Sequence, residues 1–152
     1  MEVGLFMADI KWCLGQSKGI KLIEPTDHLS QEYIKEAENT LDDMLNNKGK
    51  WKIIMAYYAC YNALYSILMK VGIKCEIHDC SIELMNEIEG FGNKDYEFMI
   101  ALKEDRIQVQ YYLKDKVLEE DSRVKSFILK CKTLLTDIDI DTVRNKLKEV
   151  SK

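Results

Sequence analysis

The chain is 152 residues long, the usual size of one domain, and a hydrophobic fraction of 47% gives it enough apolar surface for a core, which argues against disorder. A single proline and seven glycines are typical of a protein with few turns and therefore mostly helices. The net charge of −4 argues against non-specific binding to nucleic acid, because that binding depends on neutralising phosphates. Residues 1–100 carry −6 and residues 101–152 carry +2, which fits a basic face in the last third or alternating charges on exposed helices.

The start of the chain and its cysteines favour a cytoplasmic protein. "MEVGLFMADIKWC" begins with acid and has only a brief apolar run, unlike a secretory signal. The five cysteines are an odd number, and Cys60 and Cys131 fall on apolar helical stripes, so we expect no disulfide framework. The uncharged residues 53–69 are just short of a membrane span and include Asn62 and Ser66, so we expect no membrane segment.

Apolar residues at intervals of three and four predict a first helix after Pro25, capped by Thr26 or Asp27 and ending in the turn "NNKGK". Its expected inward stripe is Leu29, Tyr33, Ala37, Leu41, Met44 and Leu45. A second helix spans residues 50–71, where apolar residues cover nearly the whole circumference, and Gly72 stands where a left-handed C-cap is needed. Such a helix belongs at the centre of a bundle.

Further helices follow along the chain. Asp79 is expected to cap a short one with Leu84, Met85 and Ile88 inward. Asp95 is expected to cap a long one with the stripe Met99, Leu102, Arg106, Val109, Leu113 and Val117. A fifth helix begins near Asp121 with Val124, Phe127, Ile128, Cys131, Leu134 and Leu135 in register, and a sixth carries Ile140, Val143, Leu147 and Val150.

These segments predict an all-α protein, an up-and-down antiparallel helical bundle of four to five main helices. Residues 1–25 form an N-terminal extension, in which "IKLIE" is the one candidate strand, and residues 26–152 form the bundle domain. The sequence contains no internal repeat, low-complexity tract or Gly/Ser linker.

Four tyrosines lie on the second helix, where Tyr57, Tyr61 and Tyr65 are spaced by four and Tyr58 lies beside them. The simplest interpretation is core packing, with the hydroxyls bound to backbone carbonyls or water. The alternatives are a dimer face or a groove in which a base stacks, with Tyr58 and Tyr61 as candidates.

Arg106 is the one charged member of an apolar stripe, where an arginine is costly unless it is paired. It is expected either to meet a carboxylate such as Glu104 on a neighbouring helix or chain, or to point into a water-lined cleft. Its planar fork suits phosphate as well as carboxylate. Gln110 and Tyr111 lie one turn further on and would share that cleft, and Tyr112 follows them.

The segment "KCEIHDC" places Cys75, His78 and Cys80 within six residues, which suggests zinc. Only three ligands are local, and the paired C-x2-C hooks of structural zinc sites are absent, so we expect no metal and interpret His78 as a hydrogen-bonding loop residue. His28 is expected to be exposed in the first turn of its helix. The sequence contains no phosphate loop, nucleophile elbow or HExxH motif, and no cofactor is expected.

The order of four segments resembles the HEPN family (higher eukaryotes and prokaryotes nucleotide-binding domain) over roughly residues 27–136. The segments are "NTLDDMLNNKGKW", "AYYACYNALYSILMKVGIK", "EIH" before a short helix, and a long helix with an arginine followed by aromatic residues. The resemblance implies a bundle of four or five helices, commonly a homodimer. Many prokaryotic members act beside a minimal nucleotidyltransferase in toxin–antitoxin pairs, and the active ones are metal-independent ribonucleases.

Ribonucleases of the family use an R-x4-6-H motif, and the resemblance places Arg106 at its arginine. No histidine follows, since the residues after the gap of four are Tyr111, Tyr112 and Leu113. Tyrosine, with an ordinary pKa of about 10, is a poor base near neutral pH. The resemblance therefore implies a branch with a degenerate motif, whose members are partner or binding modules.

We expect a cytoplasmic homodimer whose Arg106 face contacts a nucleotide, an RNA phosphate or a nucleotidyltransferase partner without catalysis. The ligand-binding candidates are Arg106, Gln110, Tyr111, Tyr112, Tyr58, Tyr61 and His78. One alternative is a metal-independent ribonuclease toxin in which Tyr111 or His78 replaces the missing histidine. The other is a structural interaction protein in which Arg106 forms an internal ion pair.

Overall fold

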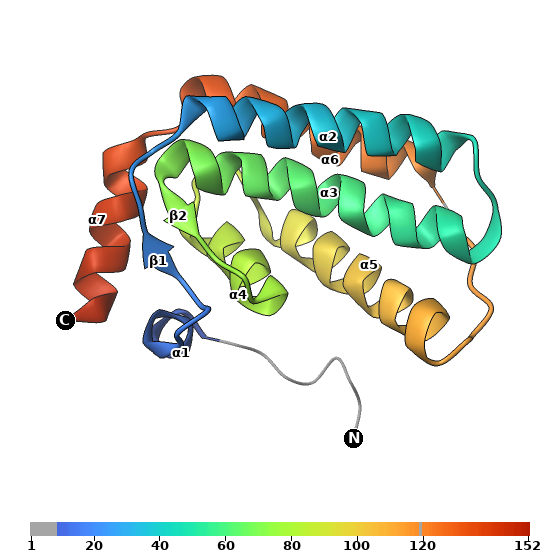
Figure 1. Ribbon diagram of the computed structural model, residues 1–152, viewed down its shortest axis with the longest axis horizontal. Helices are drawn as coiled ribbons and strands as arrows, with labels where there is room; N and C mark the ends of the chain where they lie inside the picture. The colour runs from blue at the N-terminus through green and yellow to red at the C-terminus, as the bar shows by residue number, and fades with distance from the viewer. Residues whose placement is uncertain (1–8, 119) are drawn as a thin grey trace.

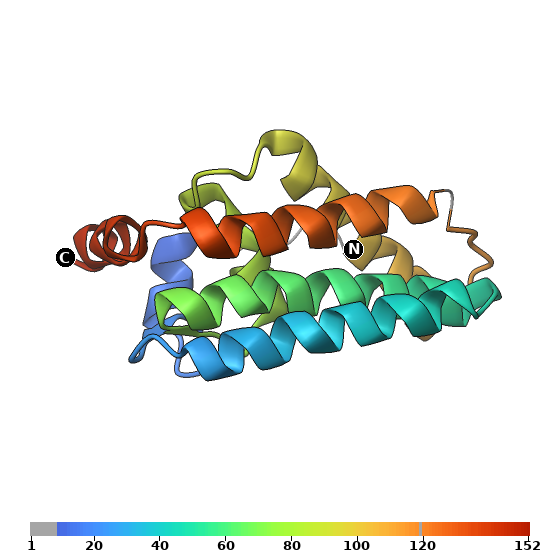
Figure 2. The ribbon, with the colours of Figure 1, turned by 90° about the horizontal axis from the view of Figure 1, so that it is seen from above.

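A computed structural model describes residues 9–118 and 120–152 of the chain. Its four long helices are α2 (Asp27–Leu45), α3 (Gly49–Val71), α5 (Asn93–Tyr111) and α6 (Asp121–Asp137). Each runs antiparallel to the one before it (Figure 1), which confirms the predicted all-α bundle. Helix α3 packs against the other three, and the view from above places it between α2 and α6 (Figure 2).

Shorter elements close one end and one side of the bundle. They are α1 (Ile10–Gly15), β1 (Lys21–Leu22), β2 (Ile73–Lys74), α4 (His78–Glu83), the 3-10 helix η2 (Leu84–Glu87) and α7 (Ile140–Ser151). Strands β1 and β2 pair antiparallel, so the candidate strand is confirmed over two residues. Across the described part of the chain, the helices are too short or too polar to cross a membrane.

The left-handed C-cap predicted at Gly72 ends helix α3, with φ 88° and ψ 50°. A Cβ at this position would lie 2.4 Å from the carbonyl oxygen of Ile23, so glycine is needed for space as well as for conformation. Arg144 of α7 fastens the same turn, because its Nη1 donates to the carbonyls of Ile23, Val71 and Gly72 at 2.8, 3.1 and 2.9 Å. The end of α3 is therefore fixed to the N-terminal segment and to α7.

The inward stripe of α2 is confirmed in its middle and is wrong at its two ends. Ala37 and Met44 are buried, and Tyr33 and Leu41 pack against the core. Thr26 caps the helix as expected, since its Oγ1 accepts a hydrogen bond from Leu29 N–H. Leu29 and Leu45 are exposed, however, and the buried residues are Ser30, Ile34, Ala37 and Met44. Because α2 contacts both α3 and α6, the side chains that point between those two helices are the buried ones.

Asp79 and Asp95 lie in the first turn of their helices, so neither is the N-cap residue itself. The predicted cap at Asp79 is wrong, whereas Asp95 does cap the start of α5, as the third residue of a capping box. Helix α4 begins one residue before Asp79, and α5 begins two residues before Asp95. Asp95 accepts a hydrogen bond from Gly92 N–H at 2.9 Å, while the Asp79 carboxylate pairs with Lys103. For Asp79, therefore, a partner elsewhere in the fold binds the carboxylate that the sequence assigned to a local cap.

The predicted α5 stripe is buried at Met99, Leu102 and Val109 but not at its end, because Leu113 and Val117 are 76% and 82% exposed. The helix ends before them, and Leu113 takes a left-handed backbone conformation with φ 54°. The chain therefore turns away before these two residues reach the inward face.

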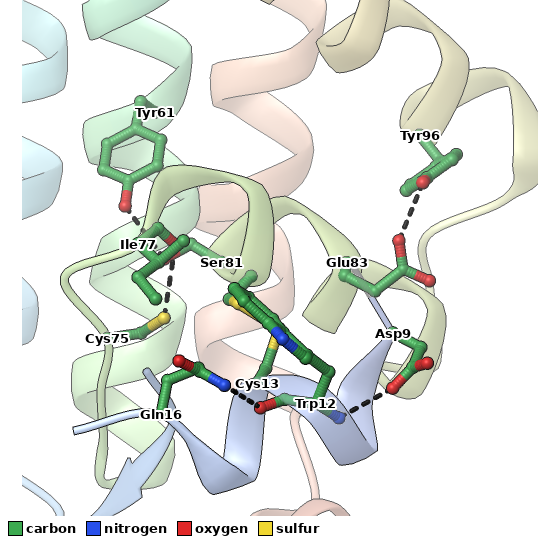
Figure 3. The surroundings of a disulfide bond; sticks show 11 residues. Asp9, Trp12, Cys13, Gln16, Tyr61, Cys75, Ile77, Ser81, Glu83 and Tyr96 are labelled. Atoms are coloured by element: carbon green, nitrogen blue, oxygen red, sulfur yellow. Dashed lines mark hydrogen bonds between the residues drawn. A yellow bond between two sulfur atoms is a disulfide. The ribbon is translucent and has the colours of Figure 1, made fainter. Parts of the chain in front are cut away.

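A disulfide joins Cys13 of α1 to Cys80 of α4 across 67 residues of sequence (Figure 3). The expectation of no disulfide framework misses this bond, because only the fold brings the two Cα atoms to 5.7 Å. Cys60 and Cys131 are free and buried in the core, as predicted, and Cys75 is also free and buried.

Candidate functional site

Side chains from three elements meet beside the middle of α3. Helix α3 supplies a row of tyrosines, α4 supplies its first residue, and α5 supplies an arginine and a tyrosine at its end. We call this group the Arg106 cluster; its members are Tyr57, Tyr58, Tyr61, His78, Arg106 and Tyr111. Positions far apart in the sequence therefore converge on one place.

Arg106 is held by aromatic rings and one hydroxyl. Its Nη1 donates to the Tyr58 hydroxyl at 2.8 Å. Its Cζ lies 4.7, 5.5 and 5.8 Å from the ring centroids of Tyr57, Tyr58 and Tyr111, within the range of cation–π attraction. Within the described chain the ion pairs leave Arg106 out, and its buried Nε has no hydrogen-bond partner there. The guanidinium is thus positioned without being neutralised.

His78 lies flat against Tyr61, with ring centroids 4.0 Å apart and an interplanar angle of 13°. Its Nδ1 is 2.8 Å from the Tyr57 hydroxyl. Burial lowers the pKa of His78 below its ordinary value of 6.5, and the positive charges of Arg106 and Lys103 lower it further, against the opposing effect of a nearby carboxylate. His78 is therefore a neutral imidazole at neutral pH.

The contact between Tyr57 and His78 determines which imidazole nitrogen carries the hydrogen. Burial raises the pKa of Tyr57, so its hydroxyl keeps its hydrogen. Tyr57 is fully buried, and in the described chain its hydrogen-bond partner is His78 Nδ1. We infer that the hydroxyl donates to Nδ1, because its hydrogen would otherwise be buried without an acceptor. The neutral ring then carries its hydrogen on Nε2, where it is a donor and not a base.

The ion pair between Lys103 and Asp79 lies next to the Arg106 cluster and does not change the net charge of the cluster. Lys103 lies one turn before Arg106 on α5 and is only 5% exposed, and its Nζ contacts Asp79 Oδ1. A buried lysine requires such a partner. Since the two charges cancel, Arg106 supplies the uncompensated charge of this region.

The other candidates from the sequence divide into two groups. Tyr61 is buried, as core packing predicts, and its hydroxyl donates to Ser81 Oγ at 2.8 Å. Tyr111 is 64% exposed beside Arg106 and offers a free ring face to a ligand. Gln110 and Tyr112 are also exposed at the end of α5, but the contacts of the described residues do not join either of them to Arg106.

Two cluster contacts were missed by sequence reasoning. Tyr57 stands one turn before Tyr61 on α3, and that spacing was the available signal for it. Lys103 stands one turn before Arg106, so a second cation on the same side of α5 could have been noticed. The role of either residue depends on where α4 lies, which the sequence does not reveal.

The zinc alternative lacks a free ligand set in this structure. Cys80 is in the disulfide, Cys75 Sγ donates to the carbonyl of Ile77 at 3.4 Å, and His78 Nδ1 accepts from Tyr57. The described residues contain no group of three or more histidine, cysteine or acidic side chains arranged to hold a metal ion.

Comparison with protein-family models, curated proteins and solved structures finds no significant match. The HEPN resemblance therefore stays a prediction from the sequence. What the Arg106 cluster can bind has to be argued from its own geometry and charge.

Proposed function

We propose that the Arg106 cluster binds an anion, a nucleotide or RNA phosphate, and that the chain is a HEPN-type helical module that does not cleave RNA. The observation that carries this proposal is the uncompensated Arg106 guanidinium, held on three tyrosine rings with no carboxylate paired to it within the described chain. An arginine in that state attracts a phosphate or carboxylate and binds it through a planar fork.

The neighbours of Arg106 suit a nucleotide better than a bare ion. His78 adds an uncharged N–H donor at Nε2, which costs no like-charge repulsion beside the guanidinium. The exposed ring of Tyr111 lies against the same guanidinium and gives a base a face on which to stack. A phosphate on Arg106 with a base on Tyr111 is the arrangement we propose.

The same tautomer favours binding over catalysis. To cleave RNA, a general base must accept the proton of the attacking ribose 2′-hydroxyl, which requires a free nitrogen lone pair. In the inferred tautomer of His78, the Nδ1 lone pair accepts the Tyr57 hydrogen bond and Nε2 carries hydrogen. The second candidate, a metal-independent ribonuclease, is nevertheless favoured by one observation: an imidazole that is neutral near pH 7 lies within electrostatic reach of Arg106. Release of the Tyr57 hydrogen bond would turn this ring into a base.

The binding test compares wild type with Arg106→Ala in titrations of ATP and of a short single-stranded RNA. Loss of a charge-assisted hydrogen-bonding group predicts affinity weaker by about tenfold or more, with the melting temperature unchanged. Arg123→Ala is a matched control, because that arginine also lies over an aromatic ring, Phe98, at 4.6 Å but outside the cluster. Equal affinity of wild type and Arg106→Ala, or no binding of either ligand by wild type, would refute the proposal.

The catalytic alternative is tested separately with tRNA or total RNA in EDTA. We expect no cleavage by wild type. Cleavage that disappears in both Arg106→Ala and His78→Gln would replace the binding proposal with the ribonuclease.

The proposed module includes two partners, a second copy of the chain and a minimal nucleotidyltransferase. The exposed Tyr112 and Leu113, which follow Tyr111 in the chain, give such a contact an apolar centre beside the cluster. Sedimentation at tens of micromolar protein tests the homodimer, and a monomer there would remove it from the proposal.

A further inference from the structure

The Cys13–Cys80 disulfide is a covalent cross-link between the N-terminal segment and the short helix α4. Both cysteines are completely buried. Figure 3 shows the indole of Trp12 beside the bond, and Ser81 of α4 between Tyr61 and Cys75. The anion site does not use either sulfur, yet the bond reaches the same short helix that carries His78.

Helix α4 is held on three sides, and only one of them uses a covalent bond. The side facing α3 has hydrogen bonds from tyrosine hydroxyls, the side facing α5 has an ion pair and a hydrogen bond, and the side facing α1 has the disulfide. The pairs are Tyr57–His78, Tyr61–Ser81, Lys103–Asp79, Tyr96–Glu83 and Cys13–Cys80. Only the disulfide can be opened by a change of thiol redox state.

Helices α1 and α4 are six residues each, well below the length at which a helix persists alone in water. Tertiary contacts therefore hold both. Besides the disulfide, the segment around α1 is held by Ile10 and Ile20, which are buried in the core, and by contacts of α1 with α7. Its backbone bonds to the bundle include Glu76 N–H to the carbonyl of Lys18 at 2.9 Å and the two-residue pairing of β1 with β2. Because α1 is so short, we expect it to open more readily than the four long helices once the covalent link is gone.

We propose that the Cys13–Cys80 disulfide is a redox clamp on α4. While the bond is formed, it holds α1 against α4 and keeps His78 in the Arg106 cluster; its reduction frees α1, loosens α4 and weakens anion binding. The clamp itself is independent of the proposed function, and only its effect on affinity depends on that function.

The chemistry is ordinary thiol–disulfide exchange with a dithiol reductant. A thiolate of the reductant attacks one sulfur of the bond, the other sulfur leaves as a thiolate, and the second thiol of the reductant resolves the mixed disulfide. Two electrons and two protons pass to Cys13 and Cys80, and the reductant becomes a disulfide. Because both sulfurs are buried, attack requires α1 to open first, so the rate of reduction follows that opening.

The compartment expected for the chain makes this bond informative. Cytosolic disulfides are usually transient, catalytic or redox-sensing, whereas permanent ones belong to oxidising compartments. The bond joins the short helix α1 to the helix that carries His78, so its reduction would act directly on the proposed site.

The first experiment tests the clamp without any ligand. Titration of thiols in denaturant is expected to find three in the oxidised protein, Cys60, Cys75 and Cys131, and all five after reduction. Trypsin is expected to cut after Lys18 about tenfold faster in the reduced protein, with the melting temperature lower by roughly 10 °C for a loop of this length. Cys13→Ser/Cys80→Ser should match the reduced protein with or without reductant, and Cys75→Ser should behave like wild type.

The second experiment titrates the short RNA into oxidised protein, reduced protein and the double serine variant. We expect affinity at least about fivefold weaker in the last two, at the low end of couplings between sites. If the oxidised protein binds no ligand, the proposed function fails, and the clamp is still judged by thiol count and proteolysis.

Four results would overturn the clamp. They are five reactive thiols in the oxidised protein, equal cleavage after Lys18 in both redox forms, redox-independent affinity, or a double serine variant that is unfolded. The last result would make the disulfide a structural link that the fold requires. Loss of the redox response in Cys75→Ser would assign the switch to a different thiol.

Discussion

The hydrogen on Tyr57 gives the most direct test of how the cluster is built. In Tyr57→Phe the ring stays and the hydroxyl is lost, so His78 Nδ1 loses its donor. A buried acceptor left without a partner costs about 1–3 kcal/mol, and His78 is only partly buried, so we expect about 1 kcal/mol in the free energy of unfolding. Urea denaturation measures this loss. Tyr33→Phe is the control, because that ring packs edge-on against Tyr65 outside the cluster.

Long-range proton–nitrogen NMR spectra of the imidazole rings report the tautomer itself. The chain has two histidines, His28 and His78, and His28 is exposed at the start of α2, as predicted, so it serves as an internal reference. At pH values above 7 we expect hydrogen on Nε2 of His78 in wild type and a mixture of tautomers in Tyr57→Phe. Hydrogen on Nδ1 in wild type would refute the reasoning and would leave Nε2 as a free base, as the ribonuclease alternative requires.

Three further predictions concern stability. The first concerns His78, whose pKa is lowered from 6.5 in the folded state, so that below pH 6.5 the unfolded chain binds more protons than the folded one. The contribution of His78 to the free energy of unfolding is therefore largest above pH 6.5 and falls as the pH drops toward the folded-state pKa. His78→Gln should flatten this slope in urea titrations between about pH 5 and 8. Gly72→Ala is expected to lower the free energy of unfolding by more than about 2 kcal/mol, because the new Cβ clashes with a backbone carbonyl in addition to the strain of a left-handed backbone conformation. Gly49 also has a left-handed conformation, with φ 66°, but open space around it, so Gly49→Ala should lower it by only about 1 kcal/mol. Equal losses in the two variants would contradict this. Lys103→Met leaves its aspartate partner on α4 unpaired and is expected to lower the free energy of unfolding by about 3 kcal/mol. The control, Lys132→Met, breaks an exposed ion pair and should lower it by less than about 1 kcal/mol. A small loss in Lys103→Met would show that the buried ion pair contributes little.

The helices could be predicted because their signals are local. Residues 50–71 are apolar all round, and a helix of that kind has to be surrounded, so the central place of α3 follows from the sequence alone. Gly72 gave the end of that helix through the backbone conformation that only glycine takes easily. The spacing of apolar residues and the chemistry of helix caps both depend on residues only a few positions apart. The predictions of helices from the sequence hold over that range.

The site could be predicted only in part, because its contacts join distant segments. Arg106 was identified from its cost in an apolar stripe, and a carboxylate partner was one of its two expected environments. In the described chain its partners are instead aromatic rings that lie 48 and 49 residues earlier. The carboxylate of Asp79 was assigned to a helix cap and instead pairs with Lys103 across 24 residues. Nothing local distinguishes a capping aspartate from one that meets a lysine on another helix.

The partners of Arg106 explain why a ligand could bind there at all. A carboxylate would satisfy the guanidinium and neutralise it, and an incoming anion would then have to displace it. Tyrosine rings and one hydroxyl fix the position of the guanidinium through weaker attractions that leave its charge available. The protein bears the cost of partly desolvating Arg106, including the buried Nε without a partner in the described chain, until an anion arrives. An anion that binds the folded state only must therefore raise the melting temperature with increasing concentration, and it must do so through Arg106.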